Sequence, residues 1–161
     1  MKDDRKLTYN FTEHGLHYEN GLTFEADKIV TLTIGTLQIN VDYFTGNILS
    51  VIGFLPLVKA TKMRIDIPKL VEESFFLPMK GIEYLKGVAY DYFNFFPMCE
   101  DYFVYEKLPI VAYDEENRRI LLGTRDATYD KFVLINKNII CGIDRKNNLK
   151  SLLILLDIIK R

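Results

Sequence analysis

Residues 36–54 read TLQINVDYFTGNILSVIGF and hold the pattern that decides the fold. The apolar positions from Leu37 to Val41 alternate with polar ones, which is the period of a strand with one buried face. Asp42 begins a polar turn, and its carboxylate can accept hydrogen bonds from the backbone amides of that turn. Gly46 supplies the positive φ that such turns need. A second apolar run follows, so the stretch predicts a β-hairpin.

The same form recurs twice further along the chain. One copy spans residues 109–123 around a turn that begins at Asp114, and the other spans 138–156 around a turn that begins at Asp144. Three hairpins of one form are typical of a meander or a sandwich. The three turn aspartates are separated by 72 residues (114 − 42) and 30 residues (144 − 114). This uneven spacing argues against a solenoid, which needs a regular period.

Shorter segments complete the expected secondary structure. Residues 7–11, 29–34 and 63–67 predict further strands. Residues 97–107 are the best helical stretch, because Pro97 suits a first helical turn and acidic residues follow it near the positive end of the helix dipole.

The last segment, residues 149–161, is open to two interpretations. Four leucines in it have helical spacing, and Asn148 could cap a helix. Read as a strand, residues 149–156 complete the third hairpin, and we favour the strand.

The length of 161 residues and the ordinary composition fit one globular domain over residues 1–161. We expect a mainly β or α+β fold, in which antiparallel hairpins form a sandwich or a partly closed barrel with one or two short helices. No linker rich in Pro, Gly or Ser divides the chain.

Charge and hydropathy limit the partners and the cellular location that we expect for the protein. The 21 Lys and Arg nearly balance the 22 Asp and Glu, so no global basic excess favours nucleic acid. The most apolar run, residues 152–159, contains Asp157 and is far shorter than the roughly 20 residues that a membrane span needs. The charged N-terminus does not resemble a signal peptide. We therefore expect a cytoplasmic protein whose Cys99 and Cys141 are reduced, with no nucleic acid or membrane as partner.

The only two histidines, His14 and His17, are weak candidates for a metal site. Histidines three apart on a helix could share a metal ion, but Gly15 between them argues against a helix. On a strand the two side chains would point to opposite faces. We expect no metal and no cofactor.

No catalytic motif stands out. Cys99 is followed by Glu100 and Asp101, which would raise the pKa of its thiol rather than lower it. None of the serines lies in a nucleophile elbow, and the scattered glycines form no phosphate loop. The turn at 114–116 lacks the remaining ligands of a calcium loop. We therefore lean toward a protein that is not an enzyme.

Residues 84–116 carry the most unusual composition. Nine aromatic residues lie between 84 and 105, and positions 90–116 hold seven acidic residues against one lysine. Tyrosine tolerates water at one end and is favoured in binding surfaces, although most of these rings must fill the core. The segment predicts an acidic, partly exposed partner-binding surface whose candidate residues are Tyr90, Asp91, Tyr92, Glu100, Asp101, Tyr105, Asp114, Glu115 and Glu116.

The C-terminal part has the opposite charge. Residues 131–161 hold seven Lys or Arg and two Asp, which gives a local net charge of +5. If folding keeps the two charged regions apart, their field would steer a charged partner toward the protein.

These observations support two hypotheses of function. The first is a non-enzymatic domain that binds a basic protein; in size, acidity and lack of a catalytic motif the chain is similar to small bacterial proteins that neutralise toxins. The second is a β-barrel or sandwich that binds or transforms a small molecule in an aromatic cavity, with His17 or Asp91 at the mouth. A homodimer through an exposed strand edge is compatible with both.

Overall fold

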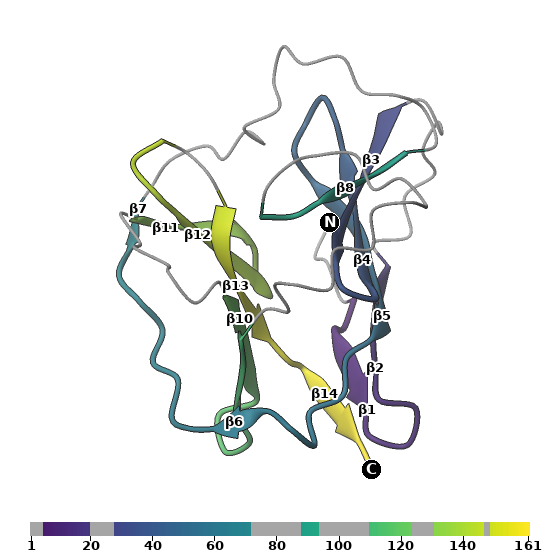
Figure 1. The fold of residues 1–161 in the computed structure, drawn as a ribbon, viewed down its shortest axis with the longest axis vertical. Coiled ribbons are helices and arrows are strands. Elements are labelled where there is room, and N and C mark those ends of the chain that lie inside the picture. The colour runs from purple at the N-terminus through teal and green to yellow at the C-terminus, as the bar shows by residue number, and fades with distance from the viewer. Residues whose placement is uncertain (1–4, 20–27, 72–87, 94–109, 124–130, 147–148) are drawn as a thin grey trace.

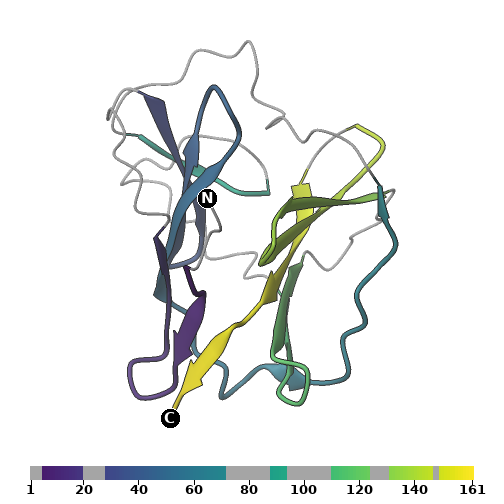
Figure 2. The same cartoon turned by 180° about the vertical axis from the view of Figure 1, so that it is seen from behind.

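The computed structural model describes residues 5–19, 28–71, 88–93, 110–123, 131–146 and 149–161 as two β-sheets that face each other (Figures 1 and 2). Sheet A has the strand order β14-β1-β2-β5-β4-β3-β8 and sheet B the order β6-β9-β10-β13-β12-β11-β7. The strands of sheet A are β1 (Thr8–Asn10), β2 (Gly15–Glu19), β3 (Ile29–Ile34), β4 (Leu37–Asp42), β5 (Ile48–Phe54), β8 (Ala89–Asp91) and β14 (Ile158–Lys160). Those of sheet B are β6 (Thr61–Lys62), β7 (Leu70–Val71), β9 (Ile110–Asp114), β10 (Arg119–Gly123), β11 (Lys131–Asn136), β12 (Ile139–Ile143) and β13 (Leu149–Leu155).

The protein is a mainly β sandwich, as the hairpin pattern predicts. Neither sheet closes into a barrel, since each has two distinct edge strands. No α-helix occurs among the described residues, and the helix expected at 97–107 lies outside them.

The hairpin of β4 and β5 is built as its sequence indicates. The apolar positions from Leu37 to Val41 are buried, and the polar ones between them lie on the other face. The Asp42 carboxylate accepts hydrogen bonds from the amides of Phe44 and Thr45 at 2.8 and 3.0 Å. Gly46 has a φ of 74°, so the predicted glycine turn is confirmed.

The ambiguous C-terminal segment consists of strands. β13 pairs on one side with β10 and on the other with β12, which places it at the centre of sheet B. Its leucines are buried because both faces of this strand are covered, and this explains why their spacing imitates a helix.

The chain contains an internal repeat of two units. Strands β1–β5 form the order β1-β2-β5-β4-β3 in sheet A, and β9–β13 form the matching order β9-β10-β13-β12-β11 in sheet B. Both units break register at the same place, between Asn40 and Val41 in the first and between Gly142 and Ile143 in the second. The uneven spacing that excludes a solenoid did not reveal this duplication, because a long connection separates the two units.

Two turns confirm the match in detail. His14 and Arg118 are the only non-glycine residues with positive φ in the described chain, at 51° and 56°, and each ends the first hairpin turn of its unit. The carbonyl of His14 accepts a hydrogen bond from the Leu55 amide, and that of Arg118 accepts one from the Leu156 amide, at 2.6 and 2.9 Å. The repeat therefore extends to single hydrogen bonds.

The two units exchange their last strands. β6 follows the first unit but pairs in parallel with β9 of the second, and β14 follows the second unit but pairs in parallel with β1 of the first. Figure 1 shows β14 crossing from sheet B to the edge of sheet A. The Asp157 carboxylate accepts the Leu7 amide at 2.8 Å beside this crossing.

Most of the core lies between the sheets, where both units bury their inward-facing aliphatic and aromatic side chains. A second, smaller core lies on the outer face of sheet B. Residues 61–71, here called the strap, run across that face from β6 at one edge to β7 at the other. Ile65 in the strap is 5% exposed and packs in one cluster with Ala112, Ile140 and Leu153.

Two glycine substitutions test the hairpin geometry of the first unit. Gly53 has a φ of 148°, and a Cβ there would lie 2.4 Å from the Thr36 carbonyl oxygen. We expect Gly53→Ala to lower the free energy of unfolding in urea by about 3 kcal/mol, from strain and overpacking together. The control is Gly35→Ala, because Gly35 has a φ of 57° but no atom within 4 Å of the new methyl group; its expected loss is about 1 kcal/mol. Equal losses would contradict the close approach at Gly53.

Candidate binding surface

Two tyrosines of the predicted acidic surface lie in the core. Tyr90 and Tyr92 at strand β8 are 6% and 2% exposed. Asp91 between them is half-buried on the opposite side, as the alternation of the three residues predicts. Its carboxylate accepts the Phe93 amide at 3.1 Å. The two rings therefore belong to the sandwich interior and offer no accessible surface to a partner.

Tyr92 joins the two sheets. Its hydroxyl donates to the carbonyl oxygen of Ser151 at 3.1 Å and lies 3.3 Å from the Cys141 sulfur. Burial raises the pKa of the Cys141 thiol to about 12 and raises the pKa of Tyr92 well above its usual range. Both groups are thus protonated at neutral pH, and Cys141 is a structural thiol as its apolar neighbours suggest.

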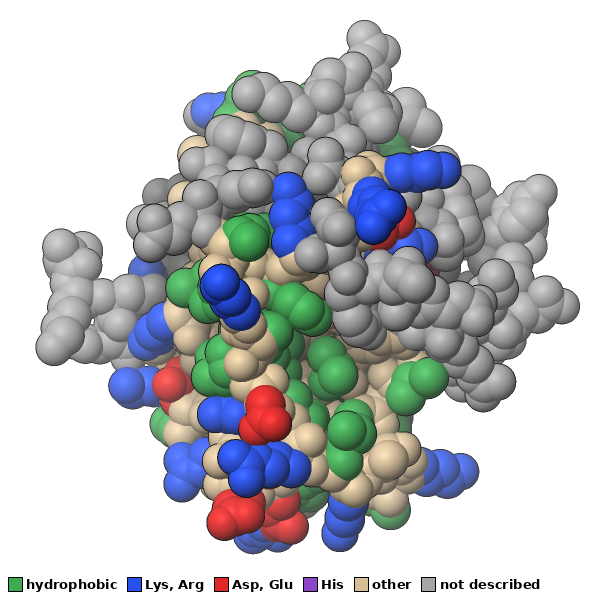
Figure 3. Space-filling view, turned by 90° about the vertical axis from the view of Figure 1, so that its left-hand side faces the viewer, with side chains coloured by type: hydrophobic (Ala, Val, Ile, Leu, Met, Phe, Trp, Pro, Cys, Tyr) green, Lys and Arg blue, Asp and Glu red, His purple; other side chains and the backbone are tan. Residues whose placement is uncertain are grey.

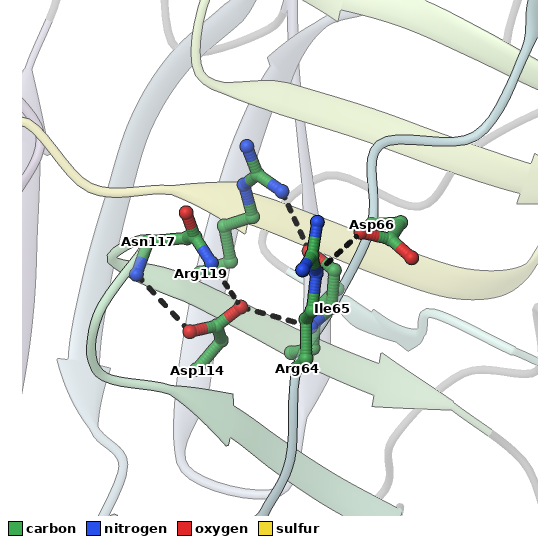
Figure 4. Close-up of polar contacts among 6 residues, drawn as sticks. All are labelled: Arg64, Ile65, Asp66, Asp114, Asn117 and Arg119. Atoms are coloured by element: carbon green, nitrogen blue, oxygen red, sulfur yellow. Dashed lines mark hydrogen bonds and ion pairs between the residues drawn. The ribbon is translucent and has the colours of Figure 1, made fainter.

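Asp114 forms structural hydrogen bonds that the sequence did not predict (Figure 4). This carboxylate is 5% exposed and accepts hydrogen bonds from the backbone and side chain of Asn117 at 3.0 and 2.8 Å. It also accepts the Ile65 amide at 2.9 Å, while Arg119 donates to the Ile65 carbonyl at 2.6 Å. Both peptide groups of Ile65 are therefore fixed by side chains of sheet B. Asp114 and Arg119 hold the strap in place.

The acidic candidates within the described residues do not gather into one surface. Glu115 and Glu116 are exposed in the turn between β9 and β10, and Glu115 forms an ion pair with Arg161. Figures 1 and 2 both place this turn at the opposite end of the molecule from β8, which carries Asp91. The other three candidates, Glu100, Asp101 and Tyr105, lie outside the described residues.

The two histidines lie at one end of sheet A. His14 ends the turn between β1 and β2 and packs edge-on against Phe54, with ring centroids 6.0 Å apart. His17 is exposed on β2. Among the described residues, no three or more His, Cys, Asp or Glu side chains are grouped closely enough to hold a metal ion.

A space between the sheets, beside Tyr92 and Cys141, has a volume of about 10 Å³. Such a volume corresponds to about one water molecule. This part of the interior is packed, so it offers no room for the small-molecule ligand of the second hypothesis.

The outer face of sheet A is hollowed. The hollow has a volume of about 470 Å³ and lies over β1, β2 and β5. Gly15 leaves space in its floor because it has no side chain, and Phe54 and Lys160 stand at its rim. Its lining residues are Thr8, Asn10, Glu13, Gly15, Leu16, His17, Ile52, Gly53, Phe54 and Lys160.

The duplication allows the two outer faces to be compared position by position. One row of outward-facing partners in sheet A reads Thr8, His17, Ile52, Gln38 and Thr33, and the matching row in sheet B reads Ala112, Leu121, Leu153, Ile140 and Leu134. The row of sheet B is wholly apolar, and four of its residues pack in the cluster under the strap, whereas Leu134 is 46% exposed. Four of the five positions in sheet A are polar, and the fifth, Ile52, is 38% exposed on the floor of the hollow.

The strap gives the outer face of sheet B a basic surface (Figure 3). Residues 61–71 hold three Lys or Arg and one Asp. Arg64 and Asp66 pair at 3.0 Å, but both side chains are more than three-quarters exposed, so this pair adds little stability. The strap therefore carries basic charge that lies outside the C-terminal region predicted from the sequence.

The described residues form no helix that is long and apolar enough to cross a membrane. No protein-family model matches the sequence, and no curated protein matches it significantly.

Asp114 makes the strap sensitive to acid. The hydrogen bond from the Ile65 amide, followed by those from Asn117, lowers the pKa of this carboxyl from its ordinary value of 3.8. A carboxyl whose pKa is lowered by folding stabilises the protein above its unfolded pKa and loses that effect as the pH falls through the folded value. We expect Asp114→Asn to be less stable than the wild type in urea at pH 7, with the difference shrinking below about pH 4. A difference that is constant from pH 7 to 3 would contradict the role of the charge.

Tyr92→Phe tests the link between the sheets. Loss of the hydroxyl removes the hydrogen bond to Ser151, and we expect the free energy of unfolding to fall by about 1 kcal/mol. Labelling of Cys141 by a thiol reagent, followed by peptide mass spectrometry, should become faster. Tyr113→Phe is the matched control, because the buried Tyr113 hydroxyl has no hydrogen-bond partner within the described part of the chain. We expect that variant to be neutral or slightly stabilised, and an equal loss in both variants would refute the assignment.

Proposed function

We propose that this chain is a non-enzymatic protein-binding domain that contacts its partner through the outer face of sheet A. The observation that carries the proposal is the hollow in that face, with exposed apolar side chains at its floor and rim. Ile52 and Phe54 are 38% and 51% exposed, and Ile158 on the neighbouring edge strand is 38% exposed. Exposed apolar groups gathered around a concavity mark interaction sites more than isolated ones do.

The polar groups around the hollow suit a protein partner. Asn10, Glu13 and Lys160 lie along its border and present an amide, a carboxylate and an ammonium group. Interfaces combine an apolar centre with a polar rim of this kind. The mixture of both charges at the border favours specific contacts over general attraction to a polyanion.

A second candidate, a basic partner such as the toxin of a toxin-neutralising protein, is favoured by the turn at Glu115 and Glu116. Glu116 is exposed in this turn. Charge reversal by Glu116→Lys should slow the capture of a basic partner at low salt and have less effect at moderate salt, because salt screens exposed charges. Capture that is insensitive to both changes would remove this candidate.

A pair of phenylalanine substitutions tests the proposed surface. Phe54 lies at the end of β5 beside the hollow, and Phe44 lies in the turn at the other end of the same hairpin. Both rings are more than half exposed, so neither substitution by Ser should unfold the chain. We expect Phe54→Ser to lose the partner that the tagged wild-type protein captures in its native host, as read by quantitative mass spectrometry. Phe44→Ser should retain that partner. Equal capture by all three proteins would overturn the proposal.

A further inference from the structure

We infer that the hollow on sheet A binds an extended segment of a partner protein, seated by one aliphatic side chain over Thr8 and Ile52. The inference deepens the proposed function and rests on it. It comes from the chain's own repeat, because the matching face of sheet B already holds an extended segment in this way.

In sheet B, the strap is the extended segment that packs on the matching outer face. The side chain of Ile65 packs with Ala112 and Leu153, whose counterparts in sheet A are Thr8 and Ile52. Those two counterparts line the hollow. The hollow therefore includes the place that Ile65 fills in the other half of the molecule.

The edges of the two sheets also correspond. In sheet B the strap begins as β6 beside β9 and ends as β7 beside β11, both in parallel. In sheet A the matching edges are occupied by β14 beside β1 and by β8 beside β3, again in parallel. Sheet A thus has the counterparts of both ends of the strap, and the hollow lies next to the end of β14.

The polar groups indicate how the segment would be held. Asn10 is the counterpart of Asp114, since each is the last residue of the first strand of its unit and caps the following turn. The Asn10 side-chain oxygen accepts the amides of Thr12 and Glu13 at 2.9 and 3.2 Å, which leaves its NH₂ group as a donor. Where Asp114 accepts the amide of Ile65, Asn10 would donate to a carbonyl of the bound segment.

The two units also differ at the residue that faces Asn10 or Asp114. Gly15 faces Asn10 across the strand pair, as Arg119 faces Asp114. Arg119 reaches along the outer face to the Ile65 carbonyl, whereas Gly15 has no side chain and forms part of the floor of the hollow. Lys160 stands at the border and favours an acidic residue in the segment beside the aliphatic one.

Gly15→Glu blocks the site with a carboxylate, because Arg119 at the matching position of sheet B donates to the Ile65 carbonyl, whereas a carboxylate repels a carbonyl oxygen and an acidic residue of the segment. A Cβ at Gly15 would lie 3.4 Å from its nearest neighbour, the Gly53 carbonyl oxygen, which is an ordinary contact. Phe44→Ser is the control with an altered surface outside the hollow. A second blocking variant, Ile52→Gln, places a polar group in the hollow in case Gly15→Glu reduces folding, and urea unfolding checks all three variants.

The probe is a phage-displayed library of random dodecapeptides selected on the immobilised full chain. We expect enriched peptides to share one aliphatic residue and to bind the wild type and Phe44→Ser equally. The dissociation constant should rise at least tenfold with either blocking variant and with an Asp in place of the aliphatic residue. Amide shifts of the ¹⁵N-labelled chain should concentrate at residues 10–17 and 52–54.

Three results would overturn the inference. Peptides that bind Gly15→Glu and Ile52→Gln as tightly as the wild type would place their site elsewhere. Self-association that both blocking variants abolish would assign the hollow to a second copy of this chain. A library that yields no binder, while Phe54→Ser still loses the native partner, would leave the proposed function standing and refute the extended segment.

Discussion

The exchange of last strands between the two units is the constraint on which the rest of the structure depends. A sheet edge exposes unpaired amides and carbonyls that must be covered. Here β14 covers the edge strand of sheet A and β6 that of sheet B, and each comes from the other half of the chain. Asp157 secures one crossing, because its carboxylate accepts both the Leu7 amide and the Asn138 side-chain amide. Neither sheet is complete without the other unit, so the two sheets form a single sandwich.

The sequence predicted what is local and missed what is distant. The turn at Asp42 and Gly46 and the strands beside it follow from side-chain period and turn chemistry, which act over a few residues. The pairing of Thr8 with Ile158 joins residues 150 positions apart and leaves no local pattern to read. The duplication was also not predicted from the sequence. The outward-facing positions of the two units differ in polarity, so the two sequences diverge at these positions.

The candidate site was harder to predict because closeness along the chain is not closeness in space. Asp91 and Asp114 belong to one acidic stretch of sequence, but strands carry them into different sheets. Asp114 is then used to hold Ile65, a contact between residues 49 positions apart that composition cannot indicate. The sequence did not predict the hollow either. The missing side chain at Gly15 becomes informative only when it is compared with Arg119 at the matching position of the other unit.

The two outer faces differ in which side chains the fold requires to be apolar. Sheet B has an apolar row that the strap covers except at Leu134, and burial of Ile65 and its neighbours contributes to stability. Sheet A, without a strap over the hollow, has Thr8 where sheet B has Ala112 and His17 where it has Leu121. Ile52 and Phe54 depart from this polar trend: Ile52 is 38% exposed, and Phe54 contacts His14 edge-on but is still 51% exposed. Exposed apolar surface of this kind gains stability only when it is covered, and we propose that a partner seated in the hollow covers it.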